Sequence, residues 1–267
     1  MSTTWDPQQY LRFADQRSRP FHDLLSRVAP PAPRTVVDLG CGPGNMTVNL
    51  ADRWPDATVV GVDISEEMIA TASAHSRPGR LSFQRADLTT WAPDHPVDVI
   101  VCAATLHWVP GHLELIPRLA GFLAPGGFFA FQVPGNFVQP SHVLLRELAR
   151  SDRWQDLLAG TVDDGPFAHE PLEYLQILLD LPGEAAVEVW ETTYHHVLSG
   201  PDPVVDWVKG TALRPVLDVL RGRGAETEAE FLASYAAVLR AAYPTDAAGR
   251  TVFPFRRIFG VVQSAQD

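Results

Sequence analysis

The stretch VVDLGCGPGN at residues 36–45 constrains the fold of this chain more than any other. Its apolar, β-branched start predicts a buried parallel strand, and its alternating glycines predict a tight turn into a helix. Glycine accepts positive φ and lets a ligand lie against the backbone. The first turn of a helix also offers unpaired N–H groups. We therefore expect a nucleotide-type cofactor at this loop.

Two details indicate which kind of cofactor fits. Dinucleotide folds usually carry G-x-G-x-x-G with a pyrophosphate on the helix N-terminus, whereas here the third glycine, Gly44, comes one residue early. Asp38 lies two residues before Gly40 and would face the pocket with a negative charge. That charge repels a pyrophosphate but suits the cationic amino-acid group of S-adenosylmethionine.

A second apolar run ends in Asp63, about 20 residues after the glycine loop, where dinucleotide folds place a ribose-binding carboxylate. A turn-forming Asp is the alternative. Together, DLGCGPG and VVGVD resemble the signature of class I S-adenosylmethionine-dependent methyltransferases. The resemblance implies that Asp87 meets the adenine amino group, although a helix-capping Asp is also possible. The expected cofactor-binding residues are Asp38, Gly40, Gly42, Asp63, Ile64, Asp87, Leu88 and Ala103.

The composition of the chain excludes several classes of binding partner. A net charge of −11 argues against nucleic acid, which needs clustered Lys and Arg, and against an anionic membrane surface. No apolar run reaches the roughly 18 residues of a spanning helix, and no signal-peptide pattern is visible. Cys41 and Cys102 form neither a disulfide framework nor a metal-ligand set. We expect a cytoplasmic protein with two reduced thiols, no metal and a small-molecule substrate.

Strand and helix patterns alternate along the first half of the chain. Strands are predicted at 35–39, 58–63, 81–86, 97–103 and 128–133, after a helix over 5–29. Beyond Pro134 we expect helical patterns at 140–180, 202–220 and 226–242, and strands at 187–198 and 251–263.

These patterns predict one domain spanning 1–267. Its expected fold class is α/β, with a doubly wound, Rossmann-like, mostly parallel seven-stranded sheet. The resemblance to class I methyltransferases implies that the last strand is antiparallel. An N-terminal cap helix (1–30) and helical insertions at 136–186 and 199–250 are expected to cover the substrate.

His107 and Trp108 follow the fourth predicted strand. Ligands of open α/β sheets lie beyond the carboxyl ends of strands where the strand order switches, here between the first and fourth. Both residues are thus expected near the transferred methyl group, as catalytic or substrate contacts. The alternatives are a structural histidine and a core tryptophan.

Several further segments resemble one family, the trans-aconitate methyltransferases, and the similarity runs nearly end to end. These segments are WDPQQY (5–10), RSRP (17–20), HWVP (107–110), QVPGN (132–136), PSHV (140–143), TTYHH (192–196), DWV (206–208) and LRP (213–215). Family members tend to carry Asp and Trp where this chain has Gly135 and Phe137.

The resemblance implies methyl transfer from S-adenosylmethionine to a carboxylate oxygen of a small polycarboxylic acid, trans-aconitate, giving the monomethyl ester. The expected substrate-binding residues are Tyr10, Arg17, Arg19, His107, Tyr194, His195 and Arg214.

Simpler interpretations of these positions stay open. Arg19 is spaced for a solvated ion pair with Asp15, and Arg257 could be a charge on an edge strand. The adjacent His195 and His196 should point to opposite sides of a strand, which makes a poor metal site.

Three rival functions remain at this point. A methyltransferase for another small acid or a natural-product hydroxyl is the first; a hydroxyl acceptor would need a base such as His107. A nicotinamide-dependent oxidoreductase is disfavoured by the glycine spacing and Asp38. A non-catalytic S-adenosylmethionine sensor is the third. The expected assembly is a monomer or weak homodimer.

Overall fold

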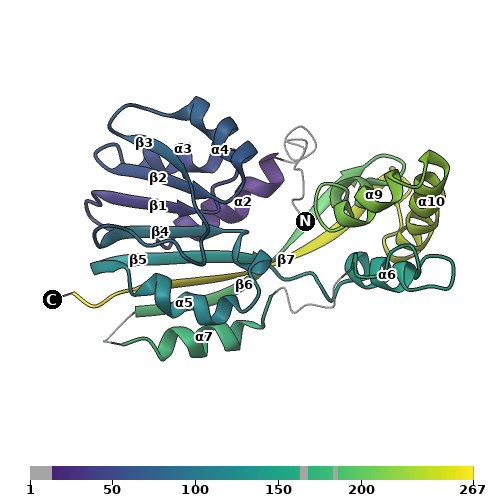
Figure 1. The fold of residues 1–267 in the computed structure, drawn as a ribbon. Helices are drawn as coiled ribbons and strands as arrows, with labels where there is room; N and C mark the ends of the chain where they lie inside the picture. Colours follow the sequence, from purple (N-terminus) through teal and green to yellow (C-terminus); the bar gives the residue numbers. More distant parts are fainter. Residues whose placement is uncertain (1–13, 163–167, 183–185, 267) are drawn as a thin grey trace. The chain divides into compact units, whose positions relative to one another are not determined.

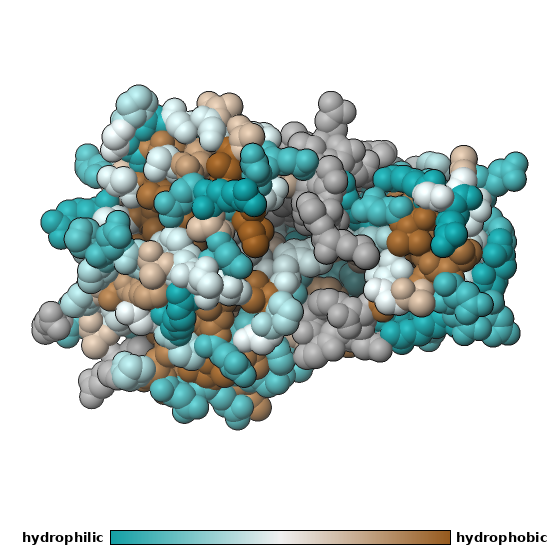
Figure 2. Space-filling view, viewed as in Figure 1, coloured by the Kyte–Doolittle hydropathy of each residue, from teal (hydrophilic) through white to brown (hydrophobic). Residues whose placement is uncertain are grey.

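The computed structural model of the protein describes residues 14–162, 168–182 and 186–266, without the side chains of 14–17. The chain divides into two compact units. We call Arg17–Pro134, Phe167–Thr192 and Arg257–Asp267 the sheet unit, and Met1–Gln16, Gly135–Pro166 and Thr193–Arg256 the helical unit. Hydrophilic residues cover much of the face shown in Figure 2, with hydrophobic residues exposed in separate areas between them.

One seven-stranded sheet organises the chain (Figure 1). The strand order is β3 (Leu81–Arg85), β2 (Thr58–Asp63), β1 (Thr35–Leu39), β4 (Val97–Ala103), β5 (Leu123–Pro134), β7 (Arg250–Gln263) and β6 (Ala186–Ser199). The strands from β3 to β5 pair in parallel, and β7 pairs antiparallel with β5. The predicted fold class, a mostly parallel seven-stranded sheet, is confirmed.

The order of the last two strands corrects one interpretation. Because β7 lies between β5 and β6, Arg257 is not on an edge strand. Its side chain is only 8% exposed, and Nη1 donates to Gln132 Oε1 at 3.0 Å. The edge-strand interpretation of Arg257 is therefore wrong.

The β1 strand is buried on both faces, as expected for a central parallel strand. Val37 and Leu39 belong to a core cluster with Phe129 and Phe131 of β5. Side chains of α5 (His112–Ala120) and α7 (Pro171–Leu179) complete this cluster. The remaining helices of the sheet unit are α2 (Ala14–Leu25), α3 (Asn45–Arg53) and α4 (Glu66–Ala72). Ser65 caps α4, its Oγ accepting from the Met68 N–H.

β5 begins five residues earlier than the prediction of 128. The Pro125-Gly126-Gly127 turn lies inside the strand, at a register shift where Leu123 pairs with Val97 and Phe128 with Val99. Gly126 has φ +72°, so the turn is an irregularity within the pairing rather than its start.

The helical unit contains α6 (Pro140–Ala149), α8 (Pro203–Val208), α9 (Arg214–Arg221) and α10 (Ala225–Ala242). Its core is built from large side chains, including Trp154, Trp207, Phe231 and Tyr235. The helix predicted over 140–180 is two helices, α6 and α7, and 202–220 is also two, α8 and α9. Among the described residues, no helix is long and apolar enough to cross a bilayer.

Candidate cofactor and active site

The glycine loop after β1 has positive φ at three glycines and open space beside one of them. Gly40, Gly42 and Gly44 have φ of +76°, +54° and +82°. The Gly40 and Cys41 N–H groups both donate to the Val62 carbonyl, at 2.7 and 3.0 Å, which anchors the loop to β2. A Cβ on Gly42 would meet nothing within 4 Å. A ligand can therefore approach the backbone at Gly42.

Asp63 joins this loop to the end of β2. Its Oδ2 accepts from the Gly42 N–H and its Oδ1 from the Ser65 N–H, both at 2.9 Å. These two hydrogen bonds agree with the alternative interpretation, in which Asp63 stabilises a turn. A carboxylate oxygen can accept more than one hydrogen bond, so each oxygen retains capacity for a ribose hydroxyl.

Asp38 is a buried acid at the end of β1. It is 2% exposed, and Thr47 Oγ1 donates to its Oδ2 at 2.7 Å. Burial raises the pKa of Asp38 from 3.8 to about 6; the Thr47 hydrogen bond opposes the rise and the nearby Asp63 charge adds to it. A cation beside Asp38 would relieve this cost of ionisation.

The loop after β3 carries the expected adenine contacts. Asp87 is exposed, and its Oδ1 accepts from the Thr89 hydroxyl at 2.7 Å and the Thr89 N–H at 2.8 Å. These bonds, the hydroxyl's first, lower the pKa of Asp87. Leu88 is buried in the core, whereas Ile64, after Asp63, is 61% exposed and offers an apolar surface.

The segment after β4 turns sharply into the expected catalytic residues. Beyond Ala103, Ala104 has φ +56°, and its N–H donates to the Gln132 carbonyl at 2.8 Å. His107 is 7% exposed and Trp108 is 50% exposed, with ring centroids 4.7 Å apart. The burial of His107 agrees with a structural histidine as well as with a site residue. The core interpretation of Trp108 is wrong, because half of its surface is accessible.

Cys41 and Cys102 are buried free thiols in the sheet unit, 6% and 0% exposed. Burial raises the pKa of both thiols, and the negative charge of Asp38 adds to the rise. The raised pKa disfavours the thiolate, which is the nucleophilic form of a cysteine.

The expected substrate-binding residues fall in both units. Tyr10 lies outside the described residues, and Arg17 lies in α2 without a described side chain; Arg19 is exposed on α2. Tyr194 is buried, at 4% exposure, and His195 is exposed on β6.

The neighbouring side chains of the helical unit refine two expectations. His196 is 9% exposed and stacks on Trp207 at 4.5 Å, so the prediction that His195 and His196 face opposite sides is confirmed. The Arg214 side chain is 13% exposed, and its Nε lies 4.0 Å from Asp218 Oδ2. Arg214 is thus a largely buried cation with one distant charged partner among the described residues.

Asn136 is a buried polar residue that was not among the site residues expected from the sequence. It is 1% exposed, and within the described part of the chain neither atom of its side-chain amide has a hydrogen-bond partner. Buried side-chain amides rarely lack hydrogen-bond partners in folded proteins. An Asn after a strand usually indicates only a turn, and Asn136 was placed within the QVPGN segment without being given a role.

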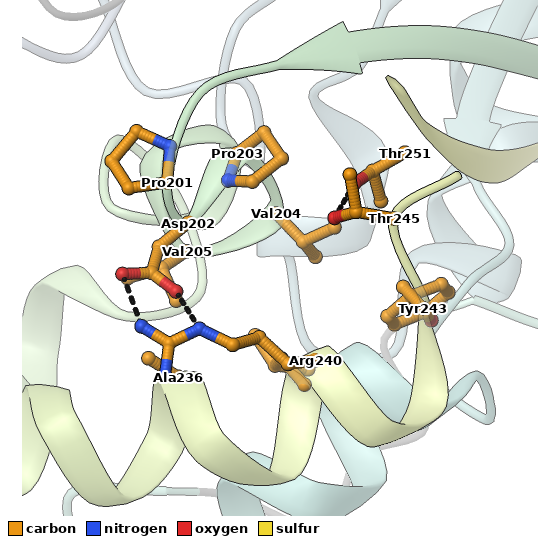
Figure 3. A pocket seen from close by; sticks show the side chains of 11 residues that line it. Pro201, Asp202, Pro203, Val204, Val205, Ala236, Arg240, Tyr243, Thr245 and Thr251 are labelled. Atoms are coloured by element: carbon orange, nitrogen blue, oxygen red, sulfur yellow. Dashed lines mark hydrogen bonds and ion pairs between the residues drawn. The ribbon is translucent and has the colours of Figure 1, made fainter. Parts of the chain in front are cut away.

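A pocket in the helical unit has its polar groups already paired (Figure 3). Arg240 binds Asp202 through two contacts of 2.8 and 2.9 Å, and Thr245 bonds Thr251 at 2.9 Å. It contains none of the expected site residues. Among the described residues, no group of three or more His, Cys, Asp or Glu is placed to hold a metal.

Comparisons with known proteins identify the family of this chain. Residues 36–127 match a family model described as a methyltransferase domain. The trans-aconitate 2-methyltransferase of Streptomyces avermitilis is 54% identical over 97% of this chain and 96% of its own, and that of Streptomyces coelicolor is 52% identical over 98% and 88%. The crystal structure of the YcgJ protein from Bacillus subtilis shares the fold, with a TM-score of 0.58 and 15% identity over 93% of this chain and 99% of its own. The chain therefore belongs to the trans-aconitate 2-methyltransferase family of class I methyltransferases.

Proposed function

We propose that this chain transfers a methyl group from S-adenosylmethionine to a carboxylate oxygen of trans-aconitate, giving the monomethyl ester. The observation that carries the proposal is the near-complete alignment with relatives of that name, at 52–54% identity. The relatives' coverage includes the helical unit, and the sheet unit carries the acidic and glycine residues that the cofactor needs.

The residues at the carboxyl ends of β1 to β4 suit the cofactor. Asp38 would complement the cationic amino-acid group, Asp63 the ribose hydroxyls, and the open backbone at Gly42 would allow close approach. Ile64 and Asp87 would flank the adenine. When bound, the cofactor supplies an electrophilic methyl group on a sulfonium.

The acceptor carboxylate needs no base. Its pKa of roughly 3–5 means that it is ionised at pH 7, so no proton must be removed before it attacks. The protein's task is alignment, which can contribute roughly 7–11 kcal/mol in well-oriented reactions, together with exclusion of water. His107 and Trp108 would line the acceptor position. The carboxylates that do not react stay charged and need arginine forks, for which Arg17, Arg19 and Arg214 are the candidates.

The cap and the setting of the protein also remain proposals. We propose that segments 1–30, 136–186 and 199–250 cover the acceptor, in a cytoplasmic monomer or weak homodimer that binds neither nucleic acid nor membrane. The net charge of −11 supports the last two statements.

Methyl transfer to trans-aconitate, with the ester identified by mass spectrometry, tests the proposal directly. The kcat should be nearly flat from about pH 6.5 to 9, because no general base titrates there. A steeply rising profile that disappears in His107→Gln would instead indicate a hydroxyl acceptor. If no methyl transfer were detected, the protein would be interpreted as a non-catalytic S-adenosylmethionine sensor. Tight binding of NAD would instead favour a nicotinamide-dependent oxidoreductase.

The arginine assignment has a matched pair of variants on α9. Arg214→Met should raise the KM for trans-aconitate about tenfold or more, since hydrogen bonds to charged groups are worth roughly 1.5–3 kcal/mol, and leave S-adenosylmethionine affinity unchanged. Arg221, whose side chain is 58% exposed and pairs with Asp218, provides the control. Equal KM changes in Arg214→Met and Arg221→Met would exclude Arg214 as a carboxylate contact.

A further inference from the structure

Thr105 connects the two loops of the sheet unit that carry the expected cofactor and catalytic residues. Its hydroxyl lies 3.3 Å from the Gly40 carbonyl oxygen, in the glycine loop after β1. The same hydroxyl lies 3.2 Å from the Ala103 carbonyl oxygen, at the end of β4. The Thr105 hydroxyl thus contacts backbone carbonyl oxygens that follow β1 and end β4.

The packing around Gly40 shows that this contact is built into the fold. A Cβ on Gly40 would fall within the Thr105 side chain, and Gly40 has φ +76°. Residue 40 is therefore glycine both for its backbone conformation and because Thr105 occupies the space. The left-handed Ala104, φ +56°, turns the chain so that Thr105 returns over β1.

The strand register places Asp38 close to the two segments that carry these carbonyls. Asp38 pairs with Val101 of β4 and lies two residues before Gly40. An ammonium group has three N–H donors, and the carboxylate with the two carbonyls offers three acceptors at one edge of the sheet. A hydroxyl carries a single proton, so the carbonyls that share it keep lone pairs for a second donor.

We propose that Thr105 is a positioning residue for the cofactor's amino-acid group. Its hydroxyl holds the Gly40 and Ala103 carbonyls in the arrangement that receives the ammonium, while its methyl group packs against Gly40. The inference rests on the proposed function, because it requires S-adenosylmethionine as the ligand.

Two ligands separate positioning from general support of the site. S-adenosylhomocysteine has the amino-acid group, whereas 5′-methylthioadenosine has the same nucleoside without it. Thr105→Val keeps the shape of the side chain and removes the hydroxyl. By calorimetry it should weaken S-adenosylhomocysteine binding about tenfold, the upper range for one hydrogen bond. Binding of 5′-methylthioadenosine should change less than about twofold. Thr105→Ser keeps the hydroxyl and should restore S-adenosylhomocysteine affinity.

Thr35→Val is the matched control. Thr35 lies at the opposite end of β1, where its hydroxyl bonds Asp98 Oδ2 at 3.0 Å. This variant should lower the thermal unfolding midpoint without changing the affinity of either ligand. Equal losses for both ligands in Thr105→Val, or no loss for either, would overturn the inference while the wild-type protein still methylates its acceptor. A wild-type protein that binds no S-adenosylhomocysteine would overturn the proposed function together with it.

Discussion

Replacing Asp38 with Asn should stabilise the ligand-free protein while weakening cofactor binding. Asp38 is 2% exposed, and burial, opposed by the Thr47 hydrogen bond and reinforced by Asp63, raises its pKa from 3.8 to about 6. Asn has nearly the same shape and can still accept the Thr47 hydroxyl, but it never ionises. The substitution therefore removes the charge and little else.

The sign and size of the effect follow from the two pKa values. The folded protein holds the Asp38 proton more tightly than the unfolded chain, so this residue's stabilising contribution is complete below about pH 4 and is lost as the pH rises through about 6. The difference between about 6 and 3.8 corresponds to roughly 3 kcal/mol, since one pH unit is worth about 1.4 kcal/mol. Above pH 7, Asp38→Asn should accordingly raise the free energy of unfolding by up to about 3 kcal/mol.

Urea unfolding of both proteins at intervals between pH 4 and 8, without ligand, measures this difference. The advantage of the variant should be near zero at pH 4 and grow through pH 6, while its affinity for S-adenosylmethionine at pH 7.5 falls by about 1.5–3 kcal/mol. A stability difference that is independent of pH, or that favours the wild-type protein at pH 8, would refute the reasoning.

The remaining predictions concern the cofactor, a metal and a buried amide. Asp63→Ala should weaken S-adenosylmethionine binding by about 1.5–3 kcal/mol in calorimetry on the folded variant, and unchanged affinity would mean that the ribose is held elsewhere. Methyl transfer should be complete in excess EDTA; activity lost there and restored by Mg²⁺ would contradict this. Asn136→Leu should raise the thermal midpoint of the ligand-free protein, because it removes two buried polar atoms without partners. A midpoint lowered by this substitution would show that the amide is satisfied in solution.

Local sequence chemistry predicted the sheet well. Each of β1, β2 and β4 is a short apolar run, and an acid lies at or next to the end of the first two, so these three strands have the predicted bounds. The start of β5 was missed because Pro125-Gly126-Gly127 has the composition of a turn, and only pairing with β4 places it inside a strand.

Non-local contacts account for the other misses. The burial of Arg257 depends on β7 pairing between β5 and β6, an order that no local pattern contains. The helix predicted over 140–180 was divided because its second part, α7, packs in the sheet unit with Tyr174 against Phe131, whereas α6 belongs to the helical unit. Cofactor residues follow strand ends and were predictable as candidates. The acceptor residues depend on tertiary arrangement.

Because Cys41 and Cys102 are buried, the rates at which thiol reagents label them can report opening of the structure around each one. A thiol reagent reaches a buried cysteine only when the structure around it opens, so labelling rates count opening events rather than native reactivity. Cys41 lies in the glycine loop, whereas Cys102 lies within β4, at 0% exposure. We expect modification of Cys41 to follow opening of the glycine loop, and modification of Cys102 to require separation of the central strands. Labelling of the two cysteines in one protein would therefore distinguish local opening of a loop from unfolding of the central sheet.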